Sequence, residues 1–139
     1  MRAMRYETKT AIVIRHDLAA WQMANVSGFL AGGLAGFFPV IVGEPYRDAN
    51  DRLYTPLIRE PLFVYGATSA ELTRTHQRAI SRGLRVAIYT EPLFRTANDI
   101  DNRASVAACA TDQLDLVGLG LHGDRKTIDK VVGGLKFLD

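Results

Sequence analysis

Cysteine and lysine are both scarce in this chain of 139 residues, and each shortage limits the functions that the sequence allows. The single cysteine, Cys109, cannot form an internal disulfide, so the sequence predicts a reducing, cytoplasmic location. Alanines surround it and no histidine or cation adjoins it, so we interpret Cys109 as a small core residue rather than a nucleophile. No lysine lies between Lys9 and Lys126, and most of the chain therefore has no ammonium group.

The net charge is small as well. A charge of +2, carried by scattered arginines, is not typical of a dedicated nucleic-acid binder, which gathers its cations into a patch. Arg2 and Arg5 are interpreted as a solvated end rather than a polyanion contact. Hydrophobic residues make up 47% and charged residues 23%, which is typical of a folded domain. We predict a flexible tail over residues 1–8 and a single domain over residues 9–139.

Charged residues are missing from the whole segment 18–43, which is long enough to raise the question of a membrane span. Gln22, Asn25 and Pro39 interrupt it, so the pattern favours a soluble helix followed by a buried strand. The N-terminus also lacks the apolar segment and cleavage site of a secretory signal. We therefore expect no membrane partner.

Metal and cofactor motifs are missing too. Three histidines without cysteine or histidine at ligand spacing predict no metal, and no serine stands in a nucleophile elbow. Residues 118–123 read GLGLHG and match the glycine pattern of dinucleotide-binding turns. The chain ends too soon after them for the second strand and its acidic residue, so no cofactor is predicted. Gly118 and Gly120 instead point to one face of a strand, where a helix, such as the glycine-containing helix over residues 18–37, can pack closely.

The remaining pattern alternates strands and helices. Strands are expected over residues 10–14, 39–43, 61–65, 85–90 and 114–121, and helices over 18–37, 69–81, from 98 or 99 to 109, and from 124 or 125 onward. A hairpin or excursion is expected over residues 46–55, around the turn-forming stretch 48–51. The alternation predicts an α/β fold with a mostly parallel sheet and helices on both faces.

Polar side chains gather after two of these strands, where ligands bind in such folds. After the first strand come Arg15, His16 and Asp17, and then Trp21, Gln22 and Asn25 on the first helix. After the strand over residues 85–90 come Glu91, Arg95, Thr96, Asn98, Asp99, Asn102 and Arg103. From these we take Asp17 and Glu91 as candidate catalytic carboxylates. Candidate ligand-binding residues are Arg15, Trp21, Gln22, Asn25, Thr96, Asn98, Asn102 and Arg103.

Each candidate also has a structural interpretation. Asp17 is an expected helix N-cap, Trp21 a core anchor, and Arg103 an ion-pair partner of Asp99 one helical turn away. His76 is expected on an exposed helix face and His122 at a strand end. A functional interpretation therefore depends on whether the candidates converge on one cleft.

Three segments carry a family resemblance: AAWQMANVSGFLAGG from Ala19, RVAIYTEPLFRTANDIDNRASV from Arg85, and LDLVGLGLHGDRKTIDKVVGGLKFL from Leu114. After residue 8 the chain resembles an uncharacterised bacterial domain-of-unknown-function family whose fold is like that of type 2 peptidyl-tRNA hydrolases. KTAIVIRHDL from Lys9 is similar to the first strand of the hydrolases, and IDKVVGGLKFL to their closing helix. The resemblance implies a three-layer α/β/α sandwich around a mixed sheet of about four strands, and a possible homodimer.

The catalytic pattern of the hydrolases is incomplete here. They place a lysine before the first helix, whereas this sequence continues with Trp21, Gln22 and Asn25, so the cation that would steady an oxyanion is absent. Their aspartate after the third strand corresponds to Glu91, which keeps a carboxylate. Arg15 or Arg103 remains as a source of positive charge, although arginine does not donate a proton near neutral pH.

Two functions remain open. One is a binding module that uses the Trp21 cleft for a small ligand, an RNA end or a partner. The other is a hydrolase of an ester or amide, with Glu91 or Asp17 activating water and Gln22, Asn25 and Arg103 orienting the substrate. The missing lysine favours binding.

Overall fold

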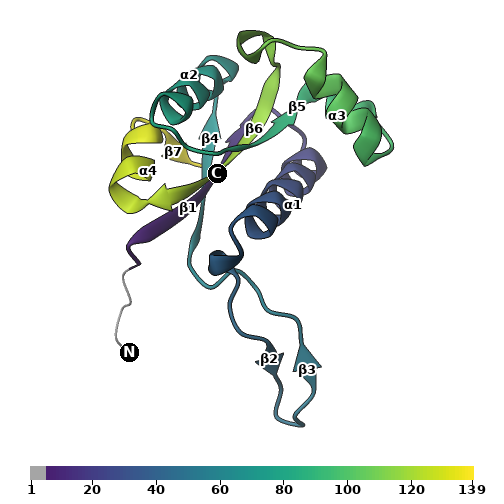
Figure 1. The fold of residues 1–139 in the computed structure, drawn as a ribbon, viewed down its shortest axis with the longest axis vertical. Helices are drawn as coiled ribbons and strands as arrows, with labels where there is room; N and C mark the ends of the chain where they lie inside the picture. Colours follow the sequence, from purple (N-terminus) through teal and green to yellow (C-terminus); the bar gives the residue numbers. More distant parts are fainter. Residues whose placement is uncertain (1–5) are drawn as a thin grey trace.

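A five-stranded sheet with helices on both faces forms the body of the protein (Figure 1). The computed structural model describes residues 6–139. The strand order is β5–β6–β1–β4–β7, with bounds Ala87–Thr90, Leu116–Asp124, Thr8–Arg15, Leu62–Ala67 and Lys136–Phe137. Helix α1 (Ala20–Phe37) covers one face, α2 (Ser69–Ser81) and α4 (Arg125–Val131) cover the other, and α3 (Asp99–Ala107) stands beside β5. The expected three layers around a mixed sheet are present, with five strands instead of about four.

The sheet is less parallel than the alternation of elements predicts. Strands β1 and β4 are parallel, but β6 is antiparallel to both β1 and β5, and β7 is antiparallel to β4. The prediction of a mostly parallel sheet is therefore wrong for the described strands. Helix α3 lies between β5 and β6 in the chain but does not cross the sheet to bring β6 in parallel, and the chain returns alongside β5 instead.

Two cores lie on the two faces of the sheet. Alternating residues of β1 supply both, because successive side chains of a strand point to opposite faces. Ala11 and Val13 pack with Leu72 of α2 and Ile128 of α4, while Ile12 and Ile14 pack with the apolar side of α1. All of these β1 side chains are fully buried, which explains the unbroken apolar run in the sequence.

The glycines of β6 admit α1, as the sequence predicts, but Gly28, Gly32 and Gly36 of α1 take no part. A Cβ at Gly118 would stand 2.5 Å from Val26 Cγ1 and 2.9 Å from Leu30 Cδ1, so this position has room only for glycine. In contrast, nothing lies within 4 Å of a Cβ at Gly28 or Gly32. The glycine side of α1 therefore faces outward, and its branched aliphatic side contacts the sheet.

The helix ends agree with the sequence signals except at α1. Asn98 and Asp124 cap α3 and α4 through side-chain acceptors, and Gly83 follows α2 with a φ of +72°. Helix α1 begins later than expected, and its N-cap is Ala19, whose N–H donates to the side chain of Gln22. The assignment of Asp17 as N-cap is wrong because its carboxylate pairs with Arg15 instead.

The expected strand over residues 39–43 is not formed. Pro39–Ile41 make a single 3-10 turn, since proline cannot donate to a strand ladder, and Val42 makes one isolated bridge with Ile58. The hairpin predicted over residues 46–55 is present as β2 (Tyr46–Arg47) and β3 (Leu53–Tyr54). It projects from the body as an arm (Figure 1).

Three further predictions need correction. Cys109 is exposed just past the end of α3 and is not a core residue. His76 is buried on the inner side of α2, and His122 is buried within β6 rather than at its end.

Arg2 and Arg5 lie outside the described residues. Within residues 6–139, no helix combines the length and apolarity that a membrane span requires.

Candidate functional site

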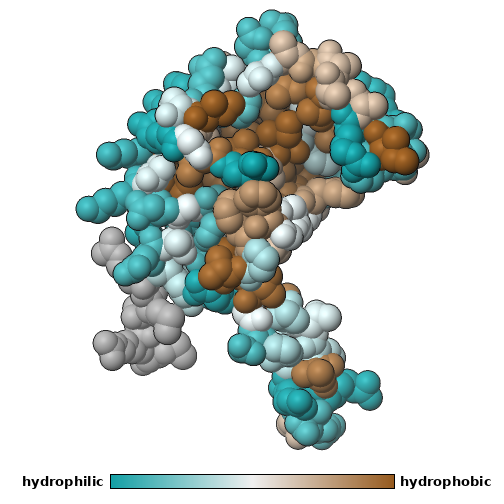
Figure 2. All heavy atoms as spheres, viewed as in Figure 1, coloured by the Kyte–Doolittle hydropathy of each residue, from teal (hydrophilic) through white to brown (hydrophobic). Residues whose placement is uncertain are grey.

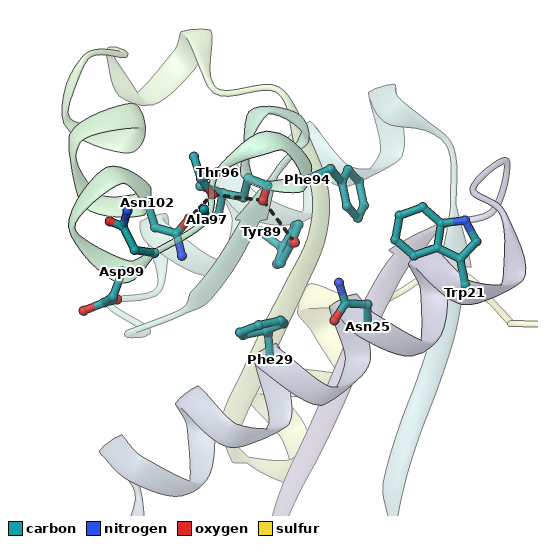
Figure 3. Close-up of a pocket in the computed structure, with 11 residues that line it drawn as sticks. Trp21, Asn25, Phe29, Tyr89, Phe94, Thr96, Ala97, Asp99 and Asn102 are labelled. Carbon is teal, nitrogen blue, oxygen red and sulfur yellow. Dashed lines mark hydrogen bonds between the residues drawn. The ribbon is translucent and has the colours of Figure 1, made fainter.

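A cleft of about 400 Å³ lies between α1 and the segment that joins β5 to α3 (Figure 3). Five of the predicted site residues line it: Trp21, Asn25, Thr96, Asn98 and Asn102. Its other lining residues are Phe29, Tyr89, Leu93, Phe94, Ala97 and Asp99. The two strand ends picked out from the sequence therefore do meet, although only part of each polar cluster reaches the cleft.

Helix α1 supplies one wall through residues spaced by four positions. Trp21, Asn25 and Phe29 share one side of the helix, since residues i and i+4 lie one above the other. Trp21 is 63% exposed and Phe29 61% exposed, so neither is the core anchor that an apolar helix residue usually becomes. Figure 3 shows all three side chains on the cleft side of α1.

The opposite wall begins at the end of β5. The 3-10 turn η2 (Glu91–Arg95) brings Phe94 back over Tyr89, with ring centroids 5.1 Å apart. The Phe94 ring also meets the edge of Trp21 across the cleft, at 6.0 Å between centroids. Aromatic rings from the two walls thus contact each other at this end of the cleft.

Polar groups follow at the start of α3. The Thr96 hydroxyl lies 3.1 Å from the Leu93 carbonyl oxygen and is hydrogen bonded to the side chain of Asn102. Asn98 accepts from the Asp101 N–H at 2.8 Å and so caps the helix. Asn102 and Asn25 lie on different walls of the cleft, on α3 and α1 (Figure 3). Amides both donate and accept, so they fit the mixed hydrogen-bonding edge of an uncharged group.

Charge is almost absent from the cleft. Asp99 is the one charged residue among those that line it, and its carboxylate is paired with Arg103 on α3. Burial raises the pKa of Tyr89, so its hydroxyl stays neutral. Among residues 6–139, no cation lines the cleft to receive a phosphate or carboxylate.

Three predicted residues near the start of α1 do not line the cleft. Arg15 Nε is 2.6 Å from Asp17 Oδ1, and Arg15 Nη1 is 3.9 Å from Asp115 Oδ1. Gln22 accepts a hydrogen bond from the Ala19 N–H and completes the start of the helix. Their polar character is therefore accounted for by local structure.

Glu91 and Arg103 also lie outside the cleft. A hydrogen bond from Arg95, 2.5 Å from Glu91 Oε1, holds the pKa of this carboxyl below its usual range. A base with a lowered pKa is a weaker proton acceptor. Arg103 lines a neighbouring groove between α1 and α3.

The aromatic residues Phe29, Tyr89 and Phe94 line the cleft but are not among the residues predicted from the sequence. Phe29 has a signal, because it continues the four-residue spacing from Trp21 and Asn25. Phe94 has none, since its position depends on the η2 turn.

Among the described residues, no group of three or more histidine, cysteine, aspartate and glutamate side chains is close enough to hold a metal ion.

Fold and cleft together define a small α/β protein with an open aromatic cleft at one side of its sheet. The chain belongs to the DUF2000 family, described as proteins of unknown function, whose family model matches residues 8–139. A solved structure of a protein of unknown function from Agrobacterium tumefaciens strain C58 is 36% identical and superimposes with a TM-score of 0.93. The match covers 97% of this chain and 100% of that one. None of the curated proteins compared matches the chain.

Proposed function

We propose that this protein is a binding domain for a small, flat, uncharged ligand or the terminal base of an RNA, held in the cleft between α1 and the η2–α3 segment. The observation that carries the proposal is the convergence of Trp21 and Phe94 with three asparagines and Thr96 around one cavity. A volume of about 400 Å³ falls within the usual range for small-molecule sites. Rings supply stacking surfaces and amides supply hydrogen bonds to the ligand edge.

The proposal includes a scaffold like that of type 2 peptidyl-tRNA hydrolases, acting in the cytoplasm and as a homodimer. KTAIVIRHDL and IDKVVGGLKFL are the segments that support this kinship. Without a lysine near the start of α1, the domain lacks the cation of the hydrolase reaction, so it binds rather than cleaves.

Hydrolysis of an ester or amide is the second candidate. It is favoured by the position of Glu91, which directly follows β5 and begins the turn that carries Phe94. Two observations count against it: the pKa of Glu91 is lowered by Arg95, and Asp17 is paired with Arg15 outside the cleft.

A thermal-shift experiment with benzamide and adenosine as probes tests binding. Saturating probe raises the Tm of the wild-type protein, because a ligand that binds only the folded state stabilises it. Trp21→Ala abolishes this shift. Tyr46→Ala is the matched control, since Tyr46 is a similarly exposed aromatic residue on the arm. If Trp21→Ala keeps the full shift, the ligand binds elsewhere.

The hydrolase alternative needs its own assay. Purified protein is incubated with aminoacyl and peptidyl esters, and product is quantified over many turnovers. Binding without turnover is the expected result. Turnover that is lost in Glu91→Gln while the circular dichroism spectrum stays unchanged would replace binding by hydrolysis.

A further inference from the structure

A second, apolar cavity opens between α1 and α3. It has a volume of about 570 Å³. Leu30 and Gly33 of α1 form one wall, Ala87 and Ile88 of β5 form the floor, and Val106 and Ala107 of α3 form the other wall. We call this cavity the α1–α3 groove. Figure 2 shows hydrophobic residues gathered in the hollow beside α3.

The groove exists because α3 stands away from the sheet. No residue of α3 is buried, although Val106 and Ala107 give one side of the helix some apolar surface. Asn102, Arg103, Val106 and Ala107 recur at helical spacing, and all four line the groove. An amphipathic helix normally buries such a side against its own core. Here that side faces an open space.

The groove adjoins the cleft. Phe29, Tyr89, Leu93 and Asn102 line both cavities. Apart from Asn102, these shared residues are aromatic or aliphatic, and the ion pair of Asp99 with Arg103 lies on α3 beside them. One molecule can therefore place a polar end among the asparagines and an apolar end beside Val106.

We propose that the ligand is a small amphiphile, with a flat uncharged polar head in the cleft and an aliphatic chain in the α1–α3 groove. This inference rests on the proposed binding function of the cleft and adds the chemical class of its ligand. Chain carbon in the groove covers Phe29, Ala87 and Val106. Arg103 is paired with Asp99 and does not oppose an uncharged chain.

A chain-length series tests the amphiphile. The probes are benzamide and its N-ethyl, N-butyl, N-hexyl and N-octyl derivatives, used below their aggregation concentrations. Trp21 is the single tryptophan of the chain and lines the cleft, so its fluorescence reports binding of the head group. Each added methylene is expected to tighten binding by about twofold to fourfold, until the groove is full.

Two alanines of α3 provide a matched pair of variants. Ala107→Phe fills the groove, whereas Ala104→Phe adds the same side chain at an exposed position that does not line it. Ala107→Phe is expected to erase the gain from chain length and leave benzamide binding within about twofold of wild type. Ala104→Phe is expected to keep the whole series.

The outcomes separate this inference from the proposed function. If benzamide binds and chain length changes nothing, the amphiphile is overturned while the cleft remains a binding site. If neither benzamide nor any derivative binds, the proposed function of the cleft falls as well. If chain length changes nothing and Ala107→Phe alters the molar mass measured by light scattering, the groove is an interface between copies of this chain instead.

Discussion

The two faces of the sheet are covered differently, and the difference locates the site. On the first face, α2 and α4 pack against β1, β4 and β6, and the charged side chain of Lys9 there is buried and paired. On the second face, α1 lies alone and α3 stands off, so a cleft and a groove stay open beside β5. We call these the closed face and the open face. Exposed aromatic side chains on the open face are therefore available to a ligand.

Lys9 is a charged residue that is buried on the closed face. It is only 8% exposed, and its ammonium donates to Asp129 Oδ1 at 2.7 Å and to the Tyr65 hydroxyl at 2.8 Å. The same ammonium lies 4.5 Å from the centre of the Phe63 ring. Burial opposes the charge, but the bonds to Asp129 and Tyr65 outweigh it and raise the pKa of Lys9. Two of the three N–H donors of this ammonium are therefore used by structural partners, and the group is nearly buried.

The largest effect on the free energy of unfolding is expected when a buried side chain is removed rather than an exposed one. Leu72 on α2 is fully buried, so Leu72→Ala is expected to lower the free energy of unfolding by about 2–5 kcal/mol. Phe29→Ala, on the open side of α1, should cost about 1 kcal/mol or less, although phenylalanine is the larger residue. Urea denaturation measures both. Equal losses would mean that the open face is packed as tightly as the closed one.

Glycines on the open face give the next largest effect, and with opposite signs. Gly118→Ala places a methyl group against Val26 and Leu30 and should cost about 1–3 kcal/mol. Gly32→Ala meets nothing within 4 Å and should stabilise α1 by about 0.5–1 kcal/mol. The same denaturation curves test the pair. A loss in Gly32→Ala would indicate that the glycine side of α1 is already covered, for example by a second copy of the chain.

Acidic pH should produce the smallest loss of stability, through one histidine on each face of the sheet. Burial lowers the pKa of His76, on the closed face, and of His122, beside Phe38 of the open face. The unfolded chain binds protons from about pH 6.5 downward, while the folded chain binds them only at lower pH, so stability falls as pH drops below that point. The lowered pKa values of Glu71 and Glu91 affect stability only at more acidic pH, below their ordinary value of 4.5.

His76→Gln and His122→Gln divide this pH effect between the faces. Both variants should flatten the loss of stability between about pH 7 and about pH 5. His76→Gln should flatten it more, because the charge of Glu60 favours the protonated form of His122. Denaturation at several pH values measures the slope. A His76→Gln slope equal to that of wild type would contradict the burial argument.

Most elements were predictable because their signals are local. Apolar runs such as that of β1 and capping residues such as Asn98 and Asp124 act on their own segment, and these predictions hold. Strand direction was not predictable, since the return of β6 beside β5 depends on where α3 docks. The candidate site divides in the same way. Trp21 and Asn25 follow from helical spacing, whereas Phe94 depends on a turn that only the folded chain defines.

Buried polar residues were the least predictable. His122 reads as a strand-end residue because it follows an apolar run, yet its Nδ1 lies 2.8 Å from Thr10 Oγ1 within the sheet. Glu60 lies 3.4 Å from the same ring and joins the cluster from a distant segment. Cys109 is the opposite case. The alanines around it indicate a buried position, but α3 stands away from the sheet and Cys109 is exposed.

The central claim is that the open face holds the ligand between α1 and the η2–α3 segment. Amide chemical-shift mapping of isotope-labelled protein, titrated with N-hexylbenzamide, tests it most directly. The account predicts that shifts cluster over residues 21–33 of α1 and residues 89–107 from β5 to α3. Shifts confined to the β2–β3 arm or to the closed face, with the α1 and α3 amides unchanged, would contradict it.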